Sequence, residues 1–525
     1  MPKPAVESWE RPVTSVSDNA ASYFVDRHIP EGRGDKIAYR EAGTLRSLTY
    51  QALVDGSERV AGALTQAGFR QEERAAMLML DTVEFPQVFF GALKCGVVPV
   101  PINTLLAPPV YDSILRDSRA SILFVSAPLY EAVKPVLAGN PYLRAVIVIG
   151  GPPAGDVHSY DQFIAGATPV ETRPVSADEV AFWLYSSGST GLPKGVQHVH
   201  SSLKATADTY GAGVLALSEG DIVLSAAKLF FAYGLGNAMT FPLAVGATTV
   251  LFAGRPTPAD MIATLNDTQA TVFCGVPTLY AAMVAEMDTS GAPDAPLRRC
   301  ISAGEALPED VGMRWEAHTD VAILDGVGST EMLHIFLSNR ADDVEYGTSG
   351  TPVPGYDVRL VDEAGDEVPD NEIGELLVNG ASAAGAYWNQ RSKSRATFEG
   401  IWTRTGDKYA RRPDGRFVYC GRTDDMFKVS GIWVSPFEVE QALASHPSVL
   451  EAAVVAAKDA DGLEKPKAFI VLSGAAPDNV EAALIDHVKS RIGKWKYPRW
   501  IEIVDDLPKT ATGKIQRFKL REGTA

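Results

Sequence analysis

An alternation of short apolar runs with amphipathic segments constrains the fold of this chain more than any other feature. The segment Thr49–Gly68 has the spacing of an amphipathic helix, with Thr49 placed to cap its start and Gly68 to end it. Strand-like runs recur before and after this helix, at Ile37–Tyr39, Ala75–Leu80, Val97–Pro101, Ser121–Val125, Ala145–Ile149, Ile222–Leu224, Thr248–Phe252, Thr271–Cys274 and Arg299–Ser302. Because strands separated by helices pair in parallel under helical layers, residues up to about 325 are predicted to form an α/β fold.

The pattern changes from about residue 346 onward. Short runs between Gly- and Asp-containing turns predict a small β-rich subdomain, with strands at Val358–Val361, Glu375–Val378 and Phe417–Tyr419. Beyond residue 424 the pattern predicts a compact tail of helices and strands, at Glu438–Ser445, Glu451–Ala457, Lys467–Leu472 and Val480–Arg491. A length of 525 residues also indicates at least two domains.

The composition excludes several classes of protein. Hydrophobic residues make up 46% of the chain, charged residues make up 22%, and a formal net charge of −17 disfavours binding to nucleic acids and anionic membranes. The cysteines Cys95, Cys274, Cys300 and Cys420 are far apart and form no CxxC pair, which predicts reduced core thiols rather than disulfides or a zinc site. No apolar run is long enough for a signal peptide or a membrane span, so we expect a cytoplasmic enzyme.

The stretch Tyr185–Val196, YSSGSTGLPKGV, has the composition of a phosphate-binding loop. Its glycines let backbone N–H groups approach a ligand closely, its hydroxyls donate hydrogen bonds, and its lysine supplies a positive charge. The strand-like run Val180–Tyr185 precedes it, so the loop is expected to leave a strand end of an open α/β sheet. It is not a Walker A loop, because a Leu-Pro pair separates its last glycine from Lys194. A Ser- and Gly-rich turn without a ligand is the structural alternative.

This stretch resembles the signature loop of the adenylate-forming superfamily, which contains acyl-CoA ligases, luciferase-like enzymes and the adenylation domains of peptide synthetases. Three further motifs agree with the resemblance: DGVGSTE at 325–331, WTRTGD at 402–407 and PKTATGK at 508–514. The resemblance implies an ATP site formed by Ser186, Ser187, Gly188, Ser189, Thr190, Gly191, Lys194, Asp325, Gly326, Thr330, Asp407, Arg422 and Lys514.

The resemblance also implies roles for individual side chains. Glu331, which is expected to be catalytic together with Thr190 and Lys514, would bind Mg²⁺ through its carboxylate, a suitable oxygen ligand for this ion. Asp407 would accept hydrogen bonds from the ribose hydroxyls. Lys514 would bridge two anions while a carboxylate attacks the α-phosphate, which lowers their repulsion. For each residue alone, a solvated charge or a surface turn is the structural alternative.

The segment Asp424–Pro436, DDMFKVSGIWVSP, resembles the hinge between the two domains of this superfamily. The resemblance implies that Asp424 takes the hinge position, where a few residues absorb changes in backbone angles. The implied domains are 1–423, with two αβ layers and a β subdomain that bind ATP and the acid, and 424–525, a small mobile α+β lid. Lys428, Ser430 and Gly431 complete the implied hinge and coenzyme A set, in which Gly431 lines the pantetheine tunnel after rotation.

The acid pocket is expected to form from Phe230–Gly236, from Ser302–Glu305, and from Gly326–Gly328 with the residues just after it. This mix of aromatic, small and apolar residues suits a flat, apolar acid. An amino acid is disfavoured, because the stretch between Lys228 and Pro242 holds no Asp to pair with a buried ammonium group. The implied substrate-binding residues are Ala232, Tyr233, Gly234, Ala303, Gly304, Gly326, Gly328, His334 and Ile335.

These pocket and hinge stretches closely resemble the benzoate-CoA ligase family, and the resemblance covers nearly the whole chain. It implies conversion of benzoate, ATP and CoA into benzoyl-CoA, AMP and diphosphate through a benzoyl-adenylate, with rotation of the C-terminal domain between the half-reactions. ATP, Mg²⁺ and coenzyme A are the implied cofactors. Ligation of 4-hydroxybenzoate, 3-hydroxybenzoate or 2-aminobenzoate stays open as an alternative, as do transfer of the aryl acid to a carrier protein and a non-catalytic binding protein on the same fold.

Two residues carry additional expectations from the resemblance. His200, just beyond the phosphate loop, matches a family histidine near the acyl pocket, so it is expected to line that pocket. Acylation of Lys514 would remove its charge and is a hypothesis for regulation. The sequence leaves open the ring substituents, the choice between monomer and homodimer, an aerobic or anaerobic pathway, and acylation of Lys514 in the cell.

Overall fold

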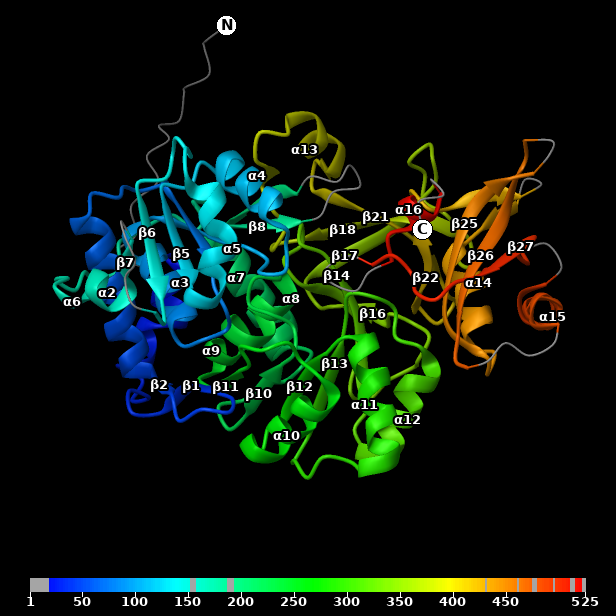
Figure 1. The fold of residues 1–525 in the computed structure, drawn as a ribbon, viewed down its shortest axis with the longest axis horizontal. Coiled ribbons are helices and arrows are strands. Elements are labelled where there is room, and N and C mark those ends of the chain that lie inside the picture. The colour runs from blue at the N-terminus through cyan, green and yellow to red at the C-terminus, as the bar shows by residue number, and fades with distance from the viewer. Residues whose placement is uncertain are drawn as a thin grey trace, which may run out of the picture.

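The computed structural model describes residues 18–151, 157–186, 193–429, 432–459, 462–474, 479–493, 496–509 and 515–521, with the backbone alone at 428, 432 and 433. The blue to green part of the chain forms two largely parallel sheets with helices packed against them (Figure 1). An antiparallel β-rich subdomain follows, and the orange to red C-terminal part lies beside the rest of the molecule (Figure 1). The predicted fold class, a large α/β part with a β subdomain and a small α+β part, is therefore confirmed.

The first sheet is parallel throughout, as the alternation of strands and helices predicts. Its strands follow the order β4 (Val98–Pro101), β3 (Arg74–Leu78), β5 (Ile122–Ser126), β6 (Ala145–Ile149) and β7 (His158–Ser159). The helices that alternate with these strands are α3 (Glu84–Cys95), α4 (Pro108–Ser118), α5 (Ala127–Leu137) and α6 (Tyr160–Ala165).

The second sheet is parallel in its centre and antiparallel at both edges. Its order is β16 (Thr351–Pro352), β15 (Ile335–Ser338), β14 (Ile323–Gly328), β13 (Arg299–Ser302), β12 (Val272–Gly275), β10 (Ile222–Ser225), β11 (Thr248–Leu251), β1 (Ile37–Glu41) and β2 (Ser47–Thr49). Helices α10 (Pro258–Thr268), α11 (Pro277–Ser290) and α12 (Glu309–Thr319) alternate with its central strands.

One hydrophobic cluster joins the two parallel sheets through α2 (Tyr50–Gln66) and α3. The start of α2 is fixed as predicted, because Thr49 Oγ1 accepts a hydrogen bond of 3.1 Å from the N–H of Ala52. Phe89 and Phe90 of α3 are fully buried in this cluster. The core therefore lies between the sheets and holds their strand ends in fixed relation to each other.

Smaller helical elements close the interior next to the predicted acid pocket. They are α1 (Ala20–Phe24), a 3₁₀ turn (Asp26–His28), α7 (His200–Thr206), π-helix η2 (Ala207–Ala212), α8 (Ala232–Leu235), π-helix η3 (Gly236–Thr240) and α9 (Phe241–Val245). Such π-helical turns are rare and are frequently found at functional sites. Here η2 and η3 contact each other.

The strand predicted at Val180–Tyr185 is confirmed, so the predicted phosphate loop follows a strand end, but that strand does not belong to the open parallel sheet expected from the sequence. Strand β8 (Val180–Ser186) pairs antiparallel with β9 (Lys194–Val199), and β19 (Ala386–Tyr387) pairs antiparallel with β9. Ser186 lies opposite Lys194 in this register. The segment between them therefore connects two antiparallel strands, which need no crossover helix. A strand-like run gives no sign of its partner's direction, which explains the wrong expectation.

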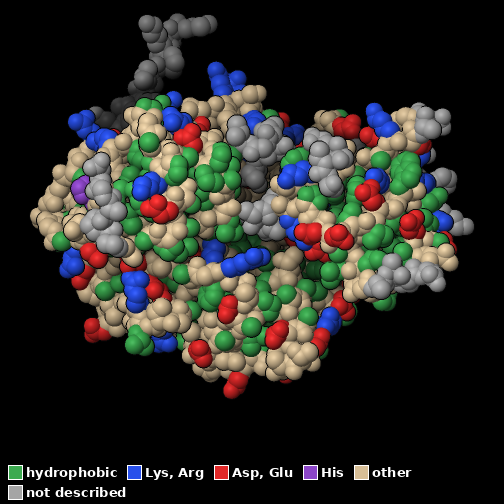
Figure 2. All heavy atoms as spheres, in the orientation of Figure 1, with side chains coloured by type: hydrophobic (Ala, Val, Ile, Leu, Met, Phe, Trp, Pro, Cys, Tyr) green, Lys and Arg blue, Asp and Glu red, His purple; other side chains and the backbone are tan. Residues whose placement is uncertain are grey.

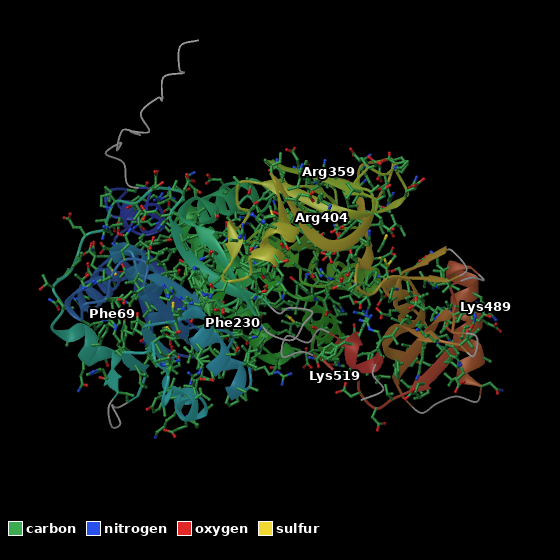
Figure 3. The ribbon with its side chains drawn as sticks, turned by 90° about the horizontal axis from the view of Figure 1, so that it is seen from above. Phe69, Phe230, Arg359, Arg404, Lys489 and Lys519 are labelled. Atoms are coloured by element: carbon green, nitrogen blue, oxygen red, sulfur yellow. The ribbon has the colours of Figure 1, made fainter. Side chains whose placement is uncertain are left out.

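The β-rich subdomain is a separate antiparallel sheet, as predicted from the short runs after residue 346. Its strands are β17 (Tyr356–Val361), β18 (Ile373–Gly380), β20 (Phe398–Glu399), β21 (Trp402–Arg411) and β22 (Phe417–Arg422), with α13 (Arg391–Thr397) beside β19 and β20. Arg359 on β17 and Arg404 on β21 both lie opposite Leu377 of β18, which separates them in this sheet (Figure 3).

The C-terminal part begins with the hairpin β23 (Phe427–Val429) and β24 (Ile432–Val434). Strands β25 (Val449–Lys458), β26 (Glu464–Leu472) and β27 (Trp500–Ile503) form its sheet, which packs with α14 (Pro436–Ala444), α15 (Val480–Ile492) and α16 (Arg517–Arg521). Lys519 on α16 lies on the side of the large part, whereas Lys489 on α15 lies at the far side (Figure 3). The space-filling view shows a hollow between the two parts with Lys and Arg side chains at its edge (Figure 2).

Two composition-based expectations can be compared with the structure. Cys274 and Cys300 are buried, Cys95 and Cys420 are partly buried, and all four thiols are free, as predicted. Within the part of the chain that the structure describes, no helix combines the length and the apolar character needed to cross a bilayer.

Candidate active site

Three side chains from distant parts of the chain meet at the start of β9. Lys194 Nζ lies 3.2 Å from Tyr387 Oη and 3.6 Å from Glu331 Oε1. The hydroxyl of Tyr387 donates a hydrogen bond of 2.7 Å to the same Glu331 oxygen. Lys194 Nζ also lies 4.3 Å from the centre of the Tyr387 ring, a cation–π distance. The predicted phosphate lysine and the predicted metal carboxylate are thus brought together, and Tyr387 joins them.

The rest of the predicted phosphate loop can be placed only at its two ends. Ser187, Gly188, Ser189, Thr190 and Gly191 lie outside the described residues. Ser186, at the end of β8, has a buried hydroxyl with no hydrogen-bond partner among the described residues. A buried hydroxyl at this place can donate to a ligand oxygen, which agrees with the phosphate-binding interpretation of the stretch.

The DGVGSTE motif is part strand and part turn, because β14 ends at Gly328. Gly326 lies opposite Ser338 and Gly328 lies opposite Ile335 across the antiparallel pair β14 and β15. A Cβ atom at Gly328 would lie 2.5 Å from the carbonyl oxygen of His334, so only glycine allows this close approach. The two glycines thus allow β14 to pack closely against the segment 334–337.

Asp325 begins this motif inside the protein. Its Oδ2 accepts a hydrogen bond of 3.3 Å from the N–H of Leu307, while its Oδ1 has no partner among the described residues. Burial raises the pKa of Asp325 to about 8. A largely protonated carboxyl group in this position can both donate to and accept from a nucleotide base.

The turn after β14 holds Glu331 by its backbone. The carbonyl oxygen of Glu331 accepts a hydrogen bond of 2.8 Å from the N–H of Ala384. The preceding carbonyl, of Thr330, lies 2.8 Å from His198 Nε2. Leu333 has a φ of 66°, a left-handed conformation that costs energy in a residue with a Cβ atom. These contacts fix the direction in which the Glu331 side chain leaves the backbone.

The predicted acid pocket has an aromatic wall. His334 is buried, and the centre of its ring lies 5.6 Å from that of Tyr233, 5.2 Å from Tyr210 and 4.5 Å from Phe241. His334 Nε2 lies 3.3 Å from the carbonyl oxygen of Tyr233. Burial lowers the pKa of His334 to about 3, so the imidazole is uncharged at neutral pH. The hydroxyl oxygen of Tyr233 lies 3.1 Å from the carbonyl oxygens of both Gly275 and Ile301, and its single hydrogen is shared between these two acceptors.

The other predicted pocket residues surround this wall at the ends of strands. Ala232 and Gly234 lie with Tyr233 in α8, and a Cβ atom at Gly234 would lie 2.1 Å from the carbonyl oxygen of Lys228. Ala303 is buried directly after β13, whereas Gly304 is exposed. Ile335 is buried at the start of β15. Tyr210 was not predicted as a pocket residue, because a single aromatic residue in a helical segment carries no sequence signal of a ligand.

The predicted ribose and nucleotide contacts form a cross-strand pair. Asp407 on β21 lies opposite Arg422 on β22, and Arg422 Nη1 lies 3.0 Å from Asp407 Oδ1. The Arg422 side chain is 44% exposed, whereas the Asp407 side chain is 16% exposed. Burial raises the pKa of Tyr387, and the charge of Glu331 raises it further. The positive charge of Arg422 acts in the opposite direction, so Arg422 lies within electrostatic reach of Tyr387 and Glu331.

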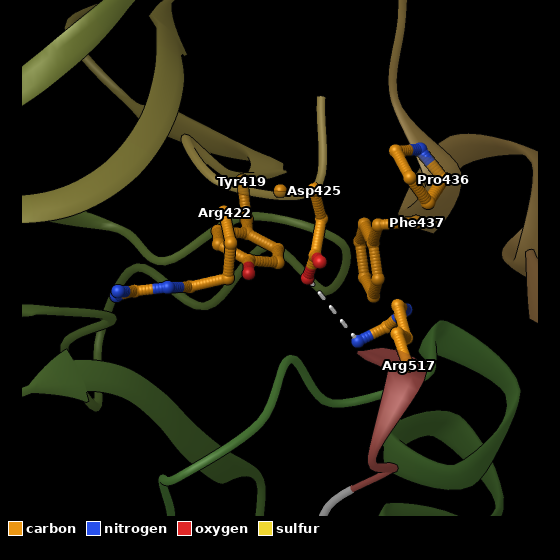
Figure 4. Close-up of a pocket in the computed structure, with 7 residues that line it drawn as sticks. Tyr419, Arg422, Asp425, Pro436, Phe437 and Arg517 are labelled. Atoms are coloured by element: carbon orange, nitrogen blue, oxygen red, sulfur yellow. Dashed lines mark ion pairs between the residues drawn. The ribbon is translucent and has the colours of Figure 1, made fainter. Parts of the chain in front are cut away.

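The predicted hinge lies in the turn between β22 and β23. The carbonyl oxygen of Asp424 accepts a hydrogen bond of 3.3 Å from Arg521 Nη1 of α16. The neighbouring Asp425 carboxylate lies 2.7 Å from Arg521 and 3.7 Å from Arg517. Figure 4 shows this ion pair of Asp425 with Arg517 next to a small cavity lined by Tyr419, Gly421, Arg422, Asp425, Pro436, Phe437 and Arg517.

Several predicted residues of the hinge and lid cannot be placed. Ser430, Gly431 and Lys514 lie outside the described residues. Lys428 is described by its backbone in β23, without its side chain. Lys509, near the start of the PKTATGK motif, pairs with Ile515, just after its end, in an isolated β-bridge.

The expectation that His200 lines the acid pocket is wrong. His200 begins α7, and its Nδ1 accepts a hydrogen bond of 3.1 Å from the N–H of Ala20 at the start of α1. Its ring also lies beside Glu179 and Gln71 rather than beside Tyr233 or His334. His198 instead approaches the site through Thr330, because alternate residues of a strand such as β9 point to opposite faces.

A magnesium ion fits this site through one protein carboxylate. Among the described residues, no group of three or more His, Cys, Asp or Glu side chains is arranged to hold a metal ion. Magnesium commonly binds through one or two carboxylates, waters and substrate phosphates rather than in a protein cage. Glu331, next to the predicted phosphate lysine, meets that requirement.

The fold and the site together define an enzyme that activates an acid with ATP. Residues 26–388 match the family model of the AMP-binding enzyme, and residues 438–514 match that of the AMP-binding enzyme C-terminal domain. The chain is 53% identical over 514 residues to a 4-hydroxybenzoate–CoA/benzoate–CoA ligase of Rhodopseudomonas palustris, with 96% of this chain and 94% of that protein covered. It is also 53% identical over 508 residues to a benzoate–CoA ligase of Thauera aromatica, with 96% and 95% covered.

Solved structures agree with these relatives. A benzoate CoA ligase from Burkholderia xenovorans LB400 superposes with a TM-score of 0.88 at 49% identity, covering 96% of this chain and all (100%) of the other. An anthranilate CoA ligase in complex with anthranoyl-AMP superposes with a TM-score of 0.92 at 41% identity, with 97% and 98% covered. The chain belongs to the AMP-binding enzyme family and is an AMP-forming acid–CoA ligase. Enzymes of this kind use ATP, Mg²⁺ and coenzyme A, which are therefore its cofactors.

Proposed function

We propose that this enzyme is a benzoate–CoA ligase that joins benzoate to coenzyme A through a benzoyl-adenylate. The observation that carries the proposal is the uncharged aromatic wall of the pocket, in which buried, neutral His334 lies against Tyr233. A flat ring gains by burial against such a wall, whereas the ammonium group of an amino acid would be left unpaired there. The whole-length likeness to ligases that are named for benzoate supports the same substrate.

The chemistry proceeds in two balanced half-reactions. In the first, a benzoate oxygen attacks the α-phosphorus of ATP, the bond to the β-phosphate breaks, and benzoyl-AMP and diphosphate form. In the second, the CoA thiol releases its proton to water, its sulfur forms a bond to the benzoyl carbonyl carbon, and the bond from that carbon to the AMP phosphate oxygen breaks, which gives benzoyl-CoA and AMP. The adenylate is needed because a free carboxylate is a poor acyl donor.

The residues divide this work by charge. Lys194 holds the phosphates, Asp407 binds the ribose hydroxyls, and Lys514 bridges the two anions of the first half-reaction. Glu331 would hold Mg²⁺, which when bound would supply positive charge to the phosphates. Electrostatic stabilisation of this kind usually supplies the largest part of such catalysis. The cysteines need no role, because neither half-reaction requires a protein nucleophile.

We propose that residues 424–525 act as a lid that turns about Asp424 between the half-reactions, carrying Lys428, Ser430, Gly431 and Lys514. The turn that contains Asp424 is the point where the strands of the β-rich subdomain end and those of the C-terminal part begin. Asp425 lies in the same turn and forms ion pairs with Arg517 and Arg521 of α16, which supports a pivot at this turn.

A hydroxybenzoate is the second candidate substrate. One of the relatives that is 53% identical is named for both 4-hydroxybenzoate and benzoate. Buried polar atoms beside the aromatic wall, including the amide of Asn237 and Nδ1 of His334, have no hydrogen-bond partner among the described residues. Such atoms can bind a ring hydroxyl, so tolerance of this group has to be measured.

Further properties are proposed without a direct contact to support them. We place the enzyme in the cytoplasm, as a monomer or homodimer, and we propose Lys514 as a site of regulatory acylation. Mass spectrometry of Lys514 from cells grown on benzoate, together with light scattering of the purified protein, tests the last two properties. Transfer to a separate carrier protein instead of CoA is the rival for the second half-reaction.

The deciding experiment measures AMP release with ATP, Mg²⁺ and CoA across a panel of acids. The panel contains benzoate, the three hydroxybenzoates, 2-aminobenzoate, cyclohexanecarboxylate, hexanoate and acetate. A preference for benzoate supports the proposal, and equal turnover of 4-hydroxybenzoate supports the second candidate. Turnover of aliphatic acids alone contradicts the aromatic pocket. Adenylate formation without any CoA thioester would move the assignment to carrier loading.

A further inference from the structure

Tyr387 links the two charged groups that are assigned to the phosphates and the metal. Its hydroxyl accepts from the Lys194 ammonium at 3.2 Å and donates to Glu331 Oε1 at 2.7 Å. A hydroxyl has one hydrogen to donate, so the order of this chain is fixed from cation through hydroxyl to carboxylate. Hydrogen bonds to charged groups are stronger than those between neutral groups.

The position of Tyr387 is itself well determined. Tyr387 lies opposite Val196 in the pairing of β19 with β9, and its N–H donates a hydrogen bond of 3.0 Å to Ser394 Oγ. The N–H of the next residue, Trp388, donates to the carbonyl oxygen of Gly195 at 2.8 Å. The Tyr387 ring packs 5.3 Å from the ring of Phe398, and only 4% of the residue is exposed. The hydroxyl is therefore held by the same strand that carries Lys194.

The hydrogen bond to Glu331 also selects one of its two carboxylate oxygens. Oε1 faces both Tyr387 and Lys194, and no hydrogen bond between described residues involves Oε2. The Glu331 side chain is 16% exposed and that of Lys194 is 18% exposed, so a ligand can reach both. Because Oε1 is held in place, Oε2 points in one direction and can bind a cation there. The carboxylate then does not have to reorient when the cation binds.

We propose that Tyr387 is a positioning residue that holds Glu331 and Lys194 in the arrangement that binds Mg²⁺-ATP. The proposal rests on the roles given above to Glu331 and Lys194. It adds Tyr387, which lies outside the sequence motifs. Tyr387 does not contact the reacting atoms in this account and acts through its two partners.

The test compares binding of ATP with and without Mg²⁺ in Tyr387→Phe by calorimetry. The substitution keeps the ring, the packing of the ring and the cation–π contact of the ring with Lys194. It removes the hydroxyl, and with it the hydrogen bonds to Lys194 and Glu331. The ratio of the ATP dissociation constant in EDTA to that in Mg²⁺ is expected to fall by about tenfold, the usual size for a lost hydrogen bond to a charged group. An unchanged ratio would overturn the proposal.

Tyr160→Phe is the matched control. Tyr160 is also 4% exposed, and its hydroxyl donates to a side-chain oxygen, Gln87 Oε1, at 3.0 Å far from the site. This variant should keep the wild-type ratio. Tyr160→Phe loses one donated hydrogen bond and Tyr387→Phe loses one donated and one accepted hydrogen bond, so Tyr387→Phe should melt only slightly below Tyr160→Phe. A much lower melting temperature for Tyr387→Phe would assign Tyr387 a general structural role and overturn the proposal.

A double-mutant cycle with Glu331→Gln separates this proposal from the assignment on which it rests. If Tyr387 acts through Glu331, then Tyr387→Phe causes little further loss of metal dependence in the Glu331→Gln enzyme. Fully additive losses would overturn the positioning role while leaving Glu331 as the metal ligand. Unchanged metal dependence in Glu331→Gln alone would overturn the metal assignment, and the positioning role with it. The acid panel still tests the benzoate assignment independently.

Discussion

Arg422 Nη1 lies 3.0 Å from Asp407 Oδ1 across the strand pair β21 and β22, so the predicted ribose carboxylate is held by the predicted nucleotide arginine. One oxygen of Asp407 is thereby engaged by the guanidinium group. The pair places two predicted nucleotide contacts on one sheet. Its geometry leads to the first prediction, on ATP binding.

Asp407→Ala should weaken ATP binding by between about tenfold and a hundredfold, because charged hydrogen bonds to the ribose hydroxyls are lost. The ATP dissociation constant from calorimetry checks this prediction. Asp414→Ala is the matched control, because Asp414 forms a similar ion pair of 3.0 Å with Arg416 in a surface turn. Equal ATP affinity in the Asp407→Ala and Asp414→Ala enzymes would contradict the role given to Asp407.

Lys514→Ala should sharply slow formation of benzoyl-AMP and largely spare the conversion of supplied benzoyl-AMP to benzoyl-CoA. The reason is that only the first half-reaction brings two anions together. The two rates are measured separately, by release of diphosphate and by thioester formation. Lys509→Ala removes a lysine of the same loop that pairs with Glu451 at 2.8 Å, and it should change neither rate substantially. Equal loss of both half-reactions in Lys514→Ala would refute its assigned role.

Acid should destabilise the protein through its buried histidines. Burial lowers the pKa of His28, His198 and His200 to about 4 and that of His334 to about 3, against a usual value of 6.5. Because the folded pKa lies below the unfolded one, stability is fully present above pH 6.5 and is lost as pH falls toward 4. At pH 5 the depressed pKa of each histidine should lower the free energy of unfolding by about 1–2 kcal/mol.

His200→Asn isolates one of these contributions, because an amide oxygen can still accept the hydrogen bond from Ala20. Its melting temperature should fall less than that of the wild type between pH 7 and pH 5. His158→Asn, at an exposed position, serves as the control and should leave the fall unchanged. A fall in His200→Asn as large as in the wild type would show that this histidine titrates alike in both states.

Glu440→Ala should loosen the last helix from the C-terminal part. Glu440 is buried, accepts from Arg517 Nε at 3.0 Å and Nη2 at 2.7 Å, and also accepts from the N–H of Val454 at 2.7 Å. Removing Glu440 leaves the largely buried Arg517 with its longer pair of 3.7 Å to Asp425, so the cost is at most that of an unpaired buried charge, about 3–5 kcal/mol. Faster hydrogen exchange in 515–521 is the expected signal. Glu451→Ala breaks a surface pair with Lys509 and should have little effect. Similar exchange in both variants would contradict the importance of Glu440.

The sequence by itself determined the element pattern and the chemical class. Helix α2 begins after its predicted cap Thr49, and strands such as β6 and β13 keep their predicted bounds, because hydrophobic periodicity and capping act within a few residues. The motifs around Lys194, Glu331 and Asp407 indicated an ATP-dependent acid-activating enzyme for a similar reason. Glycine, hydroxyl and charged residues in a fixed order carry their chemistry wherever the fold places them.

Only the tertiary structure decided which strands pair and which distant side chains meet. The pairing of β8 with β9 as an antiparallel hairpin depends on long-range contacts that a strand-like run does not encode. Tyr387 lies 56 residues from Glu331 in sequence, yet its hydroxyl lies within hydrogen-bonding distance because β19 pairs with β9. His200 resembled a pocket residue by its place near a motif, but α7 directs it to α1. Sequence order sets local conformation, whereas packing sets contacts between segments that are far apart in the chain.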